Sequence, residues 1–183
     1  MGTSSNVVAG KPNVNGCAYI APITATLPTS TGEALSEDFL ELGYVSEDGT
    51  KNSNSPSYTT IKEWGGATVL NILESKEDTF TIKFLESLNV NVLKAVYGDD
   101  NVSGNLEDGI VIKSNSQEID DKAVVIDMIL TGNIKKRIVL PIVTRTAVSD
   151  IEYKGTDAVG YEVKFTCKDD AAGNSHYEYI GGK

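Results

Sequence analysis

The sequence predicts a mainly β protein, with a β-sandwich or barrel-like fold and one short flanking α-helix. Short apolar segments alternate with polar or glycine-rich turns along most of the chain, a pattern typical of antiparallel strands. Only residues 87–97 place apolar side chains at helical spacing. The chain of 183 residues is long enough to bury a proper core, and no linker interrupts it. We therefore expect residues 1–183 to form a single domain.

The first part of the chain is expected to hold an arm, two strands and two loops. Residues 1–16 are polar and interrupted by glycine and proline, which predicts a flexible N-terminal arm. Strands are expected at residues 17–21 and 40–46, and residues 24–35 lack periodicity and should form a loop between them. Residues 47–57 are the longest polar stretch and predict a long loop.

A hairpin and a regularly alternating strand are expected next. Residues 58–64 and 68–75 flank Gly65-Gly66-Ala67, which is a good turn signal. Residues 78–86 are expected to form this strand, because three large apolar side chains alternate there with Thr79, Thr81 and Lys83. The apolar set is Phe80, Ile82 and Phe84. This period of two indicates a half-buried strand whose apolar side faces the core.

Residues 87–97 are expected to form the one helix. Ser87 is a plausible N-cap, because its hydroxyl can accept a hydrogen bond from a free backbone N–H of the first turn. Gly98 stands where a helix commonly ends with a positive φ. One apolar stripe runs along the helix and should pack on a sheet. Its members are Leu88, Val92, Leu93 and Val96.

The second half of the chain reads as a series of strands. They are expected at residues 110–113, 122–130, 134–143, 148–153, 158–168 and 177–180. Thr131-Gly132-Asn133 predicts a tight hairpin between the second and third of these strands. Pro141 has no N–H to donate, so it indicates a sheet edge or a bulge.

Charge and composition exclude several classes of protein. The chain has 26 acidic and 16 basic residues and a net charge of -10, so it should repel DNA rather than grip it. No secretory signal is visible, and the apolar run 123–130 is broken by Asp127 and too short to span a bilayer. We expect a cytoplasmic protein, or one released without a cleaved signal. Cys17 and Cys167 lie too far apart in sequence to suggest a metal-binding pair and are expected as reduced thiols.

Candidate chemistry is sparse. His176 is the only histidine and has no nucleophile motif near it, so it is expected to be an ordinary surface or strand residue. Residues 99–104 resemble the start of a calcium loop, but Ile110 stands where the bidentate glutamate is needed. We expect no catalytic residues, no metal site and no cofactor, and hence no enzyme.

Four short segments stand out by their amino-acid sequences and by their order along the chain. They are Gly43-Tyr44-Val45-Ser46-Glu47-Asp48-Gly49, Trp64-Gly65-Gly66, Tyr97-Gly98-Asp99-Asp100 and Ala172-Gly173-Asn174-Ser175-His176-Tyr177-Glu178-Tyr179. Together they make the chain similar to the major tail tube proteins of long-tailed (siphovirus-type) bacteriophages. The similarity extends over residues 13–180.

This resemblance implies an assembly and a set of partners. Proteins of this family fold as a β-sandwich with a flanking helix and form hexameric rings. The rings stack into the hollow tail tube that conducts DNA into the host. The chain would thus be a structural virion protein of the phage tail, assembled in the bacterial cytoplasm. Its partners would be copies of itself, the tail tape measure protein and the tail terminator or distal tail proteins. DNA would only pass through the lumen, and no membrane would be involved.

Two regions are expected to make the contacts of such a tube. The 47–57 loop should reach neighbouring subunits and stacked rings, since it is too long and too polar to serve a core. The residues expected in this contact are Glu47, Asp48, Gly49, Thr50, Lys51, Asn52, Ser53 and Asn54. The 58–75 hairpin should line the lumen, where Glu63 and Glu74 would make the wall negative.

Two other classes of function were weighed. A β-sandwich binding module, such as a host-surface or carbohydrate adhesin, would present aromatic residues in its loops, whereas these loops are mostly Ser, Asn, Thr and Gly. An enzyme is disfavoured by the lack of convergent catalytic residues.

Overall fold

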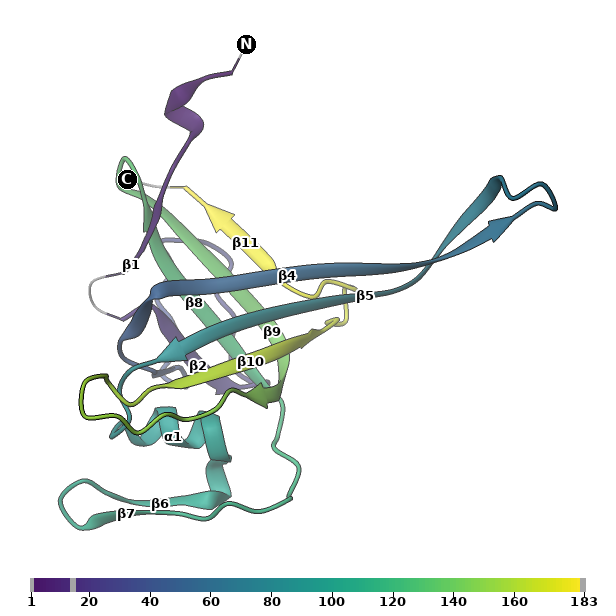
Figure 1. Ribbon diagram of the computed structural model, residues 1–183. Coiled ribbons are helices and arrows are strands. Elements are labelled where there is room, and N and C mark those ends of the chain that lie inside the picture. Colours follow the sequence, from purple (N-terminus) through teal and green to yellow (C-terminus); the bar gives the residue numbers. More distant parts are fainter. Residues whose placement is uncertain (1, 14–15, 182–183) are drawn as a thin grey trace.

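A computed structural model describes residues 2–13 and 16–181 of the chain, which are mainly β as predicted (Figure 1). The strands are β1 (Gly10–Pro12), β2 (Ala18–Pro22), β3 (Leu40–Glu41), β4 (Val45–Lys62), β5 (Thr68–Phe84), β6 (Val102–Asn105), β7 (Gly109–Ile112), β8 (Lys122–Leu130), β9 (Ile134–Val148), β10 (Tyr161–Lys168) and β11 (Tyr177–Ile180). The α-helix is α1 (Val90–Tyr97), and short 3-10 turns cover Ser4–Asn6 and Asp99–Asn101.

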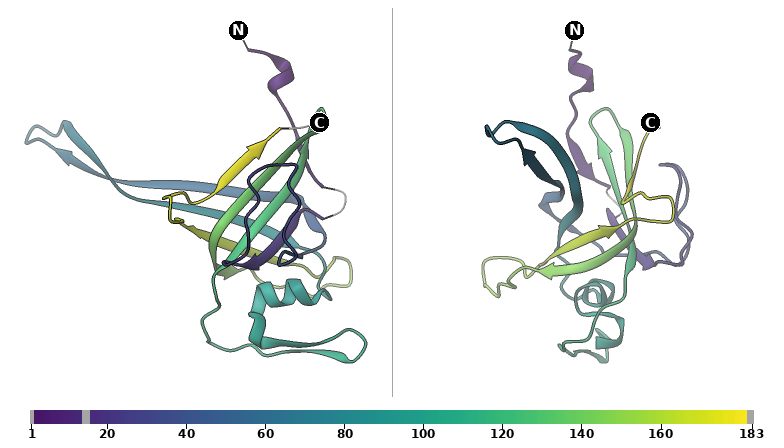
Figure 2. Two further views of the ribbon diagram at one scale, coloured as in Figure 1. Left: turned by 180° about the vertical axis from the view of Figure 1, so that it is seen from behind. Right: turned by 90° about the vertical axis from the view of Figure 1, so that its right-hand side faces the viewer.

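Nine of these strands form one curled sheet in the order β3-β2-β8-β9-β10-β5-β4, with β1 paired to β8 and β11 paired to β9. Strand β9 joins the two halves: its pairing with β8 extends from residue 134 to residue 143, and its pairing with β10 extends from residue 142 to residue 148. At the junction Pro141 and Ile142 lie opposite the single residue Ala123, so Pro141 sits at a bulge, one of the two predicted positions. The bend lets the two halves face each other as an open barrel (Figure 2).

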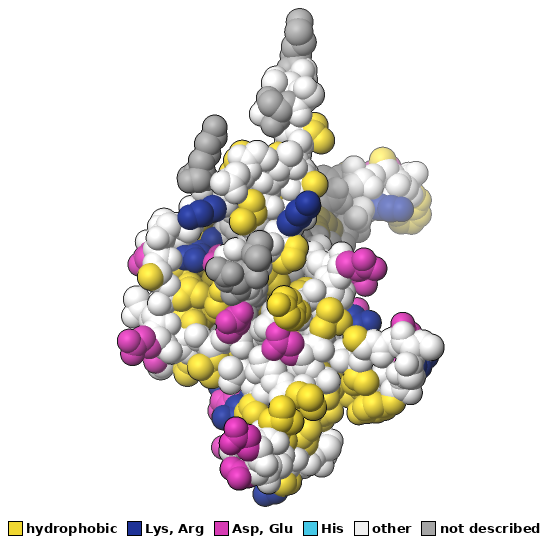
Figure 3. Space-filling model, turned by 90° about the vertical axis from the view of Figure 1, so that its left-hand side faces the viewer, with side chains coloured by type: hydrophobic (Ala, Val, Ile, Leu, Met, Phe, Trp, Pro, Cys, Tyr) yellow, Lys and Arg dark blue, Asp and Glu magenta, His cyan; other side chains and the backbone are white. Residues whose placement is uncertain are grey.

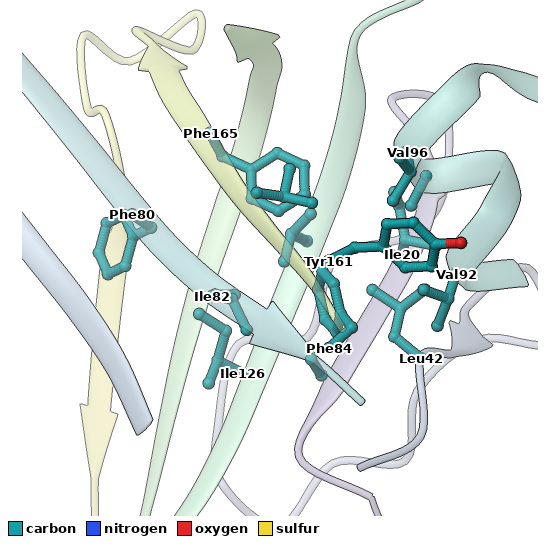
Figure 4. Packing of buried hydrophobic residues seen from close by; sticks show 14 of the residues in the cluster. Ile20, Leu42, Phe80, Ile82, Phe84, Val92, Val96, Ile126, Tyr161 and Phe165 are labelled. Atoms are coloured by element: carbon teal, nitrogen blue, oxygen red, sulfur yellow. The ribbon is translucent and has the colours of Figure 1, made fainter. Parts of the chain in front are cut away.

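The core lies between these two halves. Phe80, Ile82 and Phe84 of β5 are fully buried, which confirms the predicted inward face of this strand. Figure 4 shows the side chain of Ile82 next to that of Ile126, a residue of β8, within one apolar cluster. Burying large apolar side chains from both halves stabilises the curl, because each removes its surface from water.

Helix α1 closes one end of the barrel (Figures 1 and 2). Val92, Leu93, Ala95 and Val96 are buried there, which confirms most of the predicted stripe. The helix begins at Val90 rather than near Ser87, because Asn89 is its N-cap and accepts a hydrogen bond from the N–H of Asn91. Within the described residues, no helix is both long and apolar enough to cross a membrane.

The predicted loop at residues 47–57 is wrong, because these residues belong to the long strand β4. They pair with β5 in register from Thr50 opposite Ile82 to Ser57 opposite Ser75. Pro56 is compatible with a strand because β4 lies at the edge of the sheet, where one side of the strand needs no donor. The polar composition reflects exposure on both faces rather than a loop.

Several other boundaries also differ from expectation. Gly43 adopts a φ of 66°, which breaks the predicted strand 40–46 into β3 and the start of β4. Residues 149–153 are not a strand. Of the predicted N-terminal arm, β1 is ordered by pairing with β8, while residues 1, 14 and 15 lie outside the described residues.

A buried ion pair fixes the expected loop at residues 24–35 to the sheet. Arg137 and Asp127 are cross-strand neighbours on β9 and β8 and pair in a bidentate way, with N···O distances of 2.7 and 2.8 Å. The remaining Nη1 of Arg137 donates to the carbonyls of Ser30 and Glu33 at 3.1 and 2.6 Å. Only 6% of Arg137 is exposed, so all of these bonds form away from water.

We predict that Arg137→Met lowers the free energy of unfolding by about 3 kcal/mol, since it leaves the largely buried carboxylate of Asp127, whose side chain is 16% exposed, without its partner. Urea unfolding followed by circular dichroism measures this change. The matched control is Lys135→Met on the same strand. Lys135 is exposed, so the change there should stay within about 0.5 kcal/mol. Equal effects of the two substitutions would contradict this account of Arg137.

Candidate functional site

The most prominent feature of the surface is an arm, defined here as residues 51–77. It consists of the distal parts of β4 and β5 and projects well beyond the barrel (Figures 1 and 2). Every residue of the arm is exposed. An isolated two-stranded ribbon has no core of its own and is marginally stable in water, so contact with another surface would stabilise the arm.

The arm carries an unusual amount of apolar surface for a segment in water. Ile61 pairs with Leu70, and Thr59 pairs with Ile72, which places these four side chains on one face. On the opposite face Tyr58 pairs with Leu73. The exposed large apolar residues of the arm are Tyr58, Ile61, Trp64, Val69, Leu70, Ile72 and Leu73. Contiguous exposed apolar surface of this kind marks an interaction site.

The tip of the arm is a closed turn that presents a tryptophan. The N–H of Glu63 donates to the carbonyl of Ala67 at 2.9 Å, and the carboxylate of Glu63 accepts from the N–H of Ala67 at 3.2 Å. Hydrogen bonds from the backbone N–H groups of Gly65 and Ala67 lower the pKa of Glu63. Trp64 is completely exposed beside this turn.

Glu63 and Glu74, the residues expected to line a lumen, are both exposed on the arm. Glu74 accepts a hydrogen bond from the hydroxyl of Thr59. Because Thr59 pairs with Ile72, this bond places Glu74 on the face of Ile72. Glu63 is held by the turn, while no bond other than that of Thr59 is recorded for Glu74 among the described residues.

The expected contact segment, residues 47–54, lies where the arm leaves the barrel. Its first members, Glu47 and Asp48, border a cavity of about 620 Å³ that Lys83 and several further carboxylates also line. Asn52 points inward instead and donates to Asp78. The structure therefore divides this segment between a polar cavity, the exposed arm and an anchor inside the fold.

Asp78 is the centre of that anchor. It follows the arm on β5, has the same inward orientation as Phe80 and is only 2% exposed. Its Oδ1 accepts from Asn52 of β4 at 2.7 Å, and its Oδ2 accepts from the hydroxyl of Ser175 at 2.7 Å and contacts Nδ1 of His176. Both strands of the arm are thus tied to the segment that leads into β11.

Burial alone would raise the pKa of Asp78, since it penalises the charged form. The hydrogen bonds from Ser175, Asn52 and His176 outweigh this effect and leave the pKa lowered. The ring of His176 also packs edge-on against Phe80, with ring centroids 5.3 Å apart. His176 is therefore part of the anchor and not the ordinary surface residue that the sequence suggested.

The groups with potential chemistry serve the fold. Burial raises the pKa of Cys17 to about 11 and that of Cys167 to about 12, so both thiols are protonated and poor nucleophiles near neutral pH. Asn101 of the calcium-like segment donates to the carbonyl of Tyr97 and caps the end of the helix instead. The described residues contain no group of three or more His, Cys, Asp or Glu side chains suited to a metal ion.

Sequence reasoning missed the anchor, although one signal for it was present. Asp78 stands two residues before Phe80, so the alternation that turns Phe80 inward also turns Asp78 inward. A carboxylate on the buried side of a strand requires donors. Those donors, Asn52, Ser175 and His176, come from distant parts of the chain and had no signal of their own.

The comparison with known proteins gives one clear match. The family model described as "Phage tail tube protein" matches residues 1–183. No curated protein matches the chain.

We predict that Asp78→Asn lowers the free energy of unfolding by about 1–3 kcal/mol near neutral pH, because the amide can no longer accept from both Ser175 and His176. The pKa of Asp78 is lowered on folding, so its carboxylate stabilises the fold above the ordinary range near pH 4. This contribution is lost as the pH falls through the lowered pKa. Urea unfolding at about pH 7 and about pH 3 should show the difference from wild type shrinking at the acidic value.

The exposed Asp120 provides the matched control for this measurement. Asp120→Asn should change stability by less than about 0.5 kcal/mol at either pH. A difference between wild type and Asp78→Asn that stays constant or grows on acidification would show that the charge of Asp78 does not stabilise the fold.

Proposed function

The chain belongs to the phage tail tube protein family, and from this premise we propose that its copies assemble into hexameric rings that stack into a hollow tube. The protein is a structural component of the virion tail. In our proposal the tube conducts DNA into the host and is assembled in the bacterial cytoplasm. The tail tape measure protein and the tail terminator or distal tail proteins are its further partners.

The observation that carries this proposal is the excess surface of the single chain. The protein exposes 11462 Å², whereas a compact monomer of 19.6 kDa exposes about 8,600 Å². Each partner in a standard interface buries roughly 800 Å². The excess of about 2,900 Å² is therefore enough for several contacts per copy, and much of it lies on the arm.

Strand edges support a head-to-tail arrangement. In the described sheet β4 has a partner on one side only, so a row of its backbone groups is free to pair with another chain. The arm and the surface it covers are different parts of the chain, which makes the contact heterologous and allows rings to close. We propose that residues 47–54 contact neighbouring subunits and rings, now as part of a strand rather than as a loop.

We further propose that the 58–75 hairpin lines the lumen with Glu63 and Glu74. Carboxylates on the wall would repel the phosphates of passing DNA and prevent it from sticking. Within residues 58–75 the one lysine, Lys62, stands against these two glutamates, so this hairpin has little positive charge with which to bind phosphate.

A second candidate is a β-sandwich binding module such as an adhesin. The full exposure of Trp64 at the tip of the arm favours it, because aromatic side chains are common anchors in binding sites. Electron microscopy of the purified protein separates the two functions. Long hollow filaments are expected only for the tube.

We predict that shortening the arm abolishes tubes and spares the fold. Joining Ser57 to Ser75 through an Asn-Gly turn removes residues 58–74, all of which are exposed. The thermal melt followed by circular dichroism should hardly change, while negative-stain images should lose filaments. Tubes of normal length from the shortened protein would refute this role of the arm.

A milder variant keeps the shape of the arm. Ile61→Thr with Ile72→Thr retains β-branched side chains but removes apolar surface from one face. The concentration needed for assembly should rise by about tenfold or more, since burial of each isoleucine contributes about 1 kcal/mol or more. Thr60→Ser is the matched control on the opposite face and should assemble like the wild type.

A density map of assembled tubes tests the lumen and the contact segment together. We predict that Glu63 and Glu74 face the channel and that residues 47–54 touch a neighbouring copy. Both glutamates on the outer surface of the tube would refute the lumen assignment. If residues 47–54 touch only their own subunit, the proposed contact between copies would be refuted.

A further inference from the structure

Strand β9 carries two arginines in very different surroundings. All the donors of Arg137 that point inward have acceptors, as described above. In contrast, the side chain of Arg145 makes no hydrogen bond or ion pair within the described part of the chain. Its Nε is buried and has no hydrogen-bond partner there. A buried donor without a partner is rare in native proteins and calls for an explanation.

The position of Arg145 explains its burial. It pairs with Phe165 of β10 and lies two residues after the buried Val143, so its side chain starts on the inner side of the sheet. There it borders a cavity of about 420 Å³ between the end of α1 and residues 148–151. Ser114, Asn115 and Gln117 provide further polar groups in the lining.

The partial burial of Arg145 is a cost to the single chain, because its buried Nε has no hydrogen-bond partner among the described residues. Burial without a compensating anion lowers the pKa of its guanidinium, which reflects the cost of keeping the charge there. Asp150 lines the same cavity but forms no ion pair with Arg145. An apolar side chain of similar length would fill the position at lower cost, because replacing an unsatisfied buried donor by an apolar group relieves a penalty.

We propose that Arg145 is a docking point for a carboxylate of a second copy of this chain, which enters the cavity when the tube forms. This inference rests on the proposed function. A guanidinium matches a carboxylate through two parallel hydrogen bonds, and the lining of this cavity combines that planar cation with one carboxylate, Asp150, and the neutral polar side chains of Ser114, Asn115 and Gln117. A neighbouring copy offers such groups in abundance, since the chain has 26 acidic residues and carboxylates are spread over the visible face of the body (Figure 3).

The test compares Arg145→Met with the wild type in two measurements. The melting temperature of the unassembled protein should stay the same or rise, because an unsatisfied donor has been removed. The concentration needed to form tubes should increase by about tenfold or more, because a buried intermolecular ion pair has been lost. Arg145→Lys keeps the positive charge but cannot form two parallel hydrogen bonds to a carboxylate, so it should assemble at a concentration between those of the wild type and Arg145→Met.

Arg137→Met is the matched comparison on the same strand, and it should lower the melting temperature strongly. Tubes of Arg145→Met that form at the wild-type concentration would overturn the proposal and leave the proposed function intact. A drop in its melting temperature as large as that of Arg137→Met would overturn it too, since Arg145 would then be structural. A wild-type protein that stays monomeric at every concentration would overturn both proposals.

Discussion

The buried carboxylate of Asp78 is the interaction on which the relation between body and arm depends. A ribbon that projects from a barrel transmits any force on its tip to the place where it leaves the sheet. At that place Asp78 bonds Asn52 of the other arm strand and Ser175 and His176 of the segment before β11. One carboxylate on β5 therefore joins two other parts of the chain that are far apart in sequence. Hydrogen bonds to a charged carboxylate are shorter and stronger than bonds between neutral groups, so they hold the base of the arm firmly to the barrel.

The arm and the body also differ in charge. Residues 51–77 contain three lysines and three glutamates, so the arm has no net charge and the whole formal charge of -10 belongs to the rest of the chain. Bodies of two copies repel each other at long range, while an arm can approach a body without that penalty. The apolar side chains of the arm then supply attraction at contact. This division would let acidic copies repel one another at long range and still associate through one segment, as we propose.

The sequence predicts the strands of this structure best where one face of the strand is buried and the other is less buried. Alternation at Phe80, Ile82 and Phe84 reveals a strand because these side chains are fully buried, whereas Thr81 and Lys83 between them are only partly buried. The turn at Gly132 and the stripe on α1 are equally clear, because each has a local physical cause. Residues 51–57 of β4 are exposed on both faces, so no alternation marks them and their serines and asparagines resemble a loop. Only their pairing with β5 makes them a strand, and such pairing is a property of two segments together.

Arg145 could not have been found in this way, since what distinguishes it is the lack of a partner in the folded chain. Arg137 on the same strand differs from it, because its guanidinium donates two hydrogen bonds to the carboxylate of Asp127. The unpartnered Nε of Arg145 and the exposed isoleucines of the arm are both unfavourable in a monomer. Selection removes such features unless a function compensates for them. The arm and Arg145 are both consistent with assembly: in our proposal the separate chain is an intermediate, and the state for which its sequence is selected contains more than one copy.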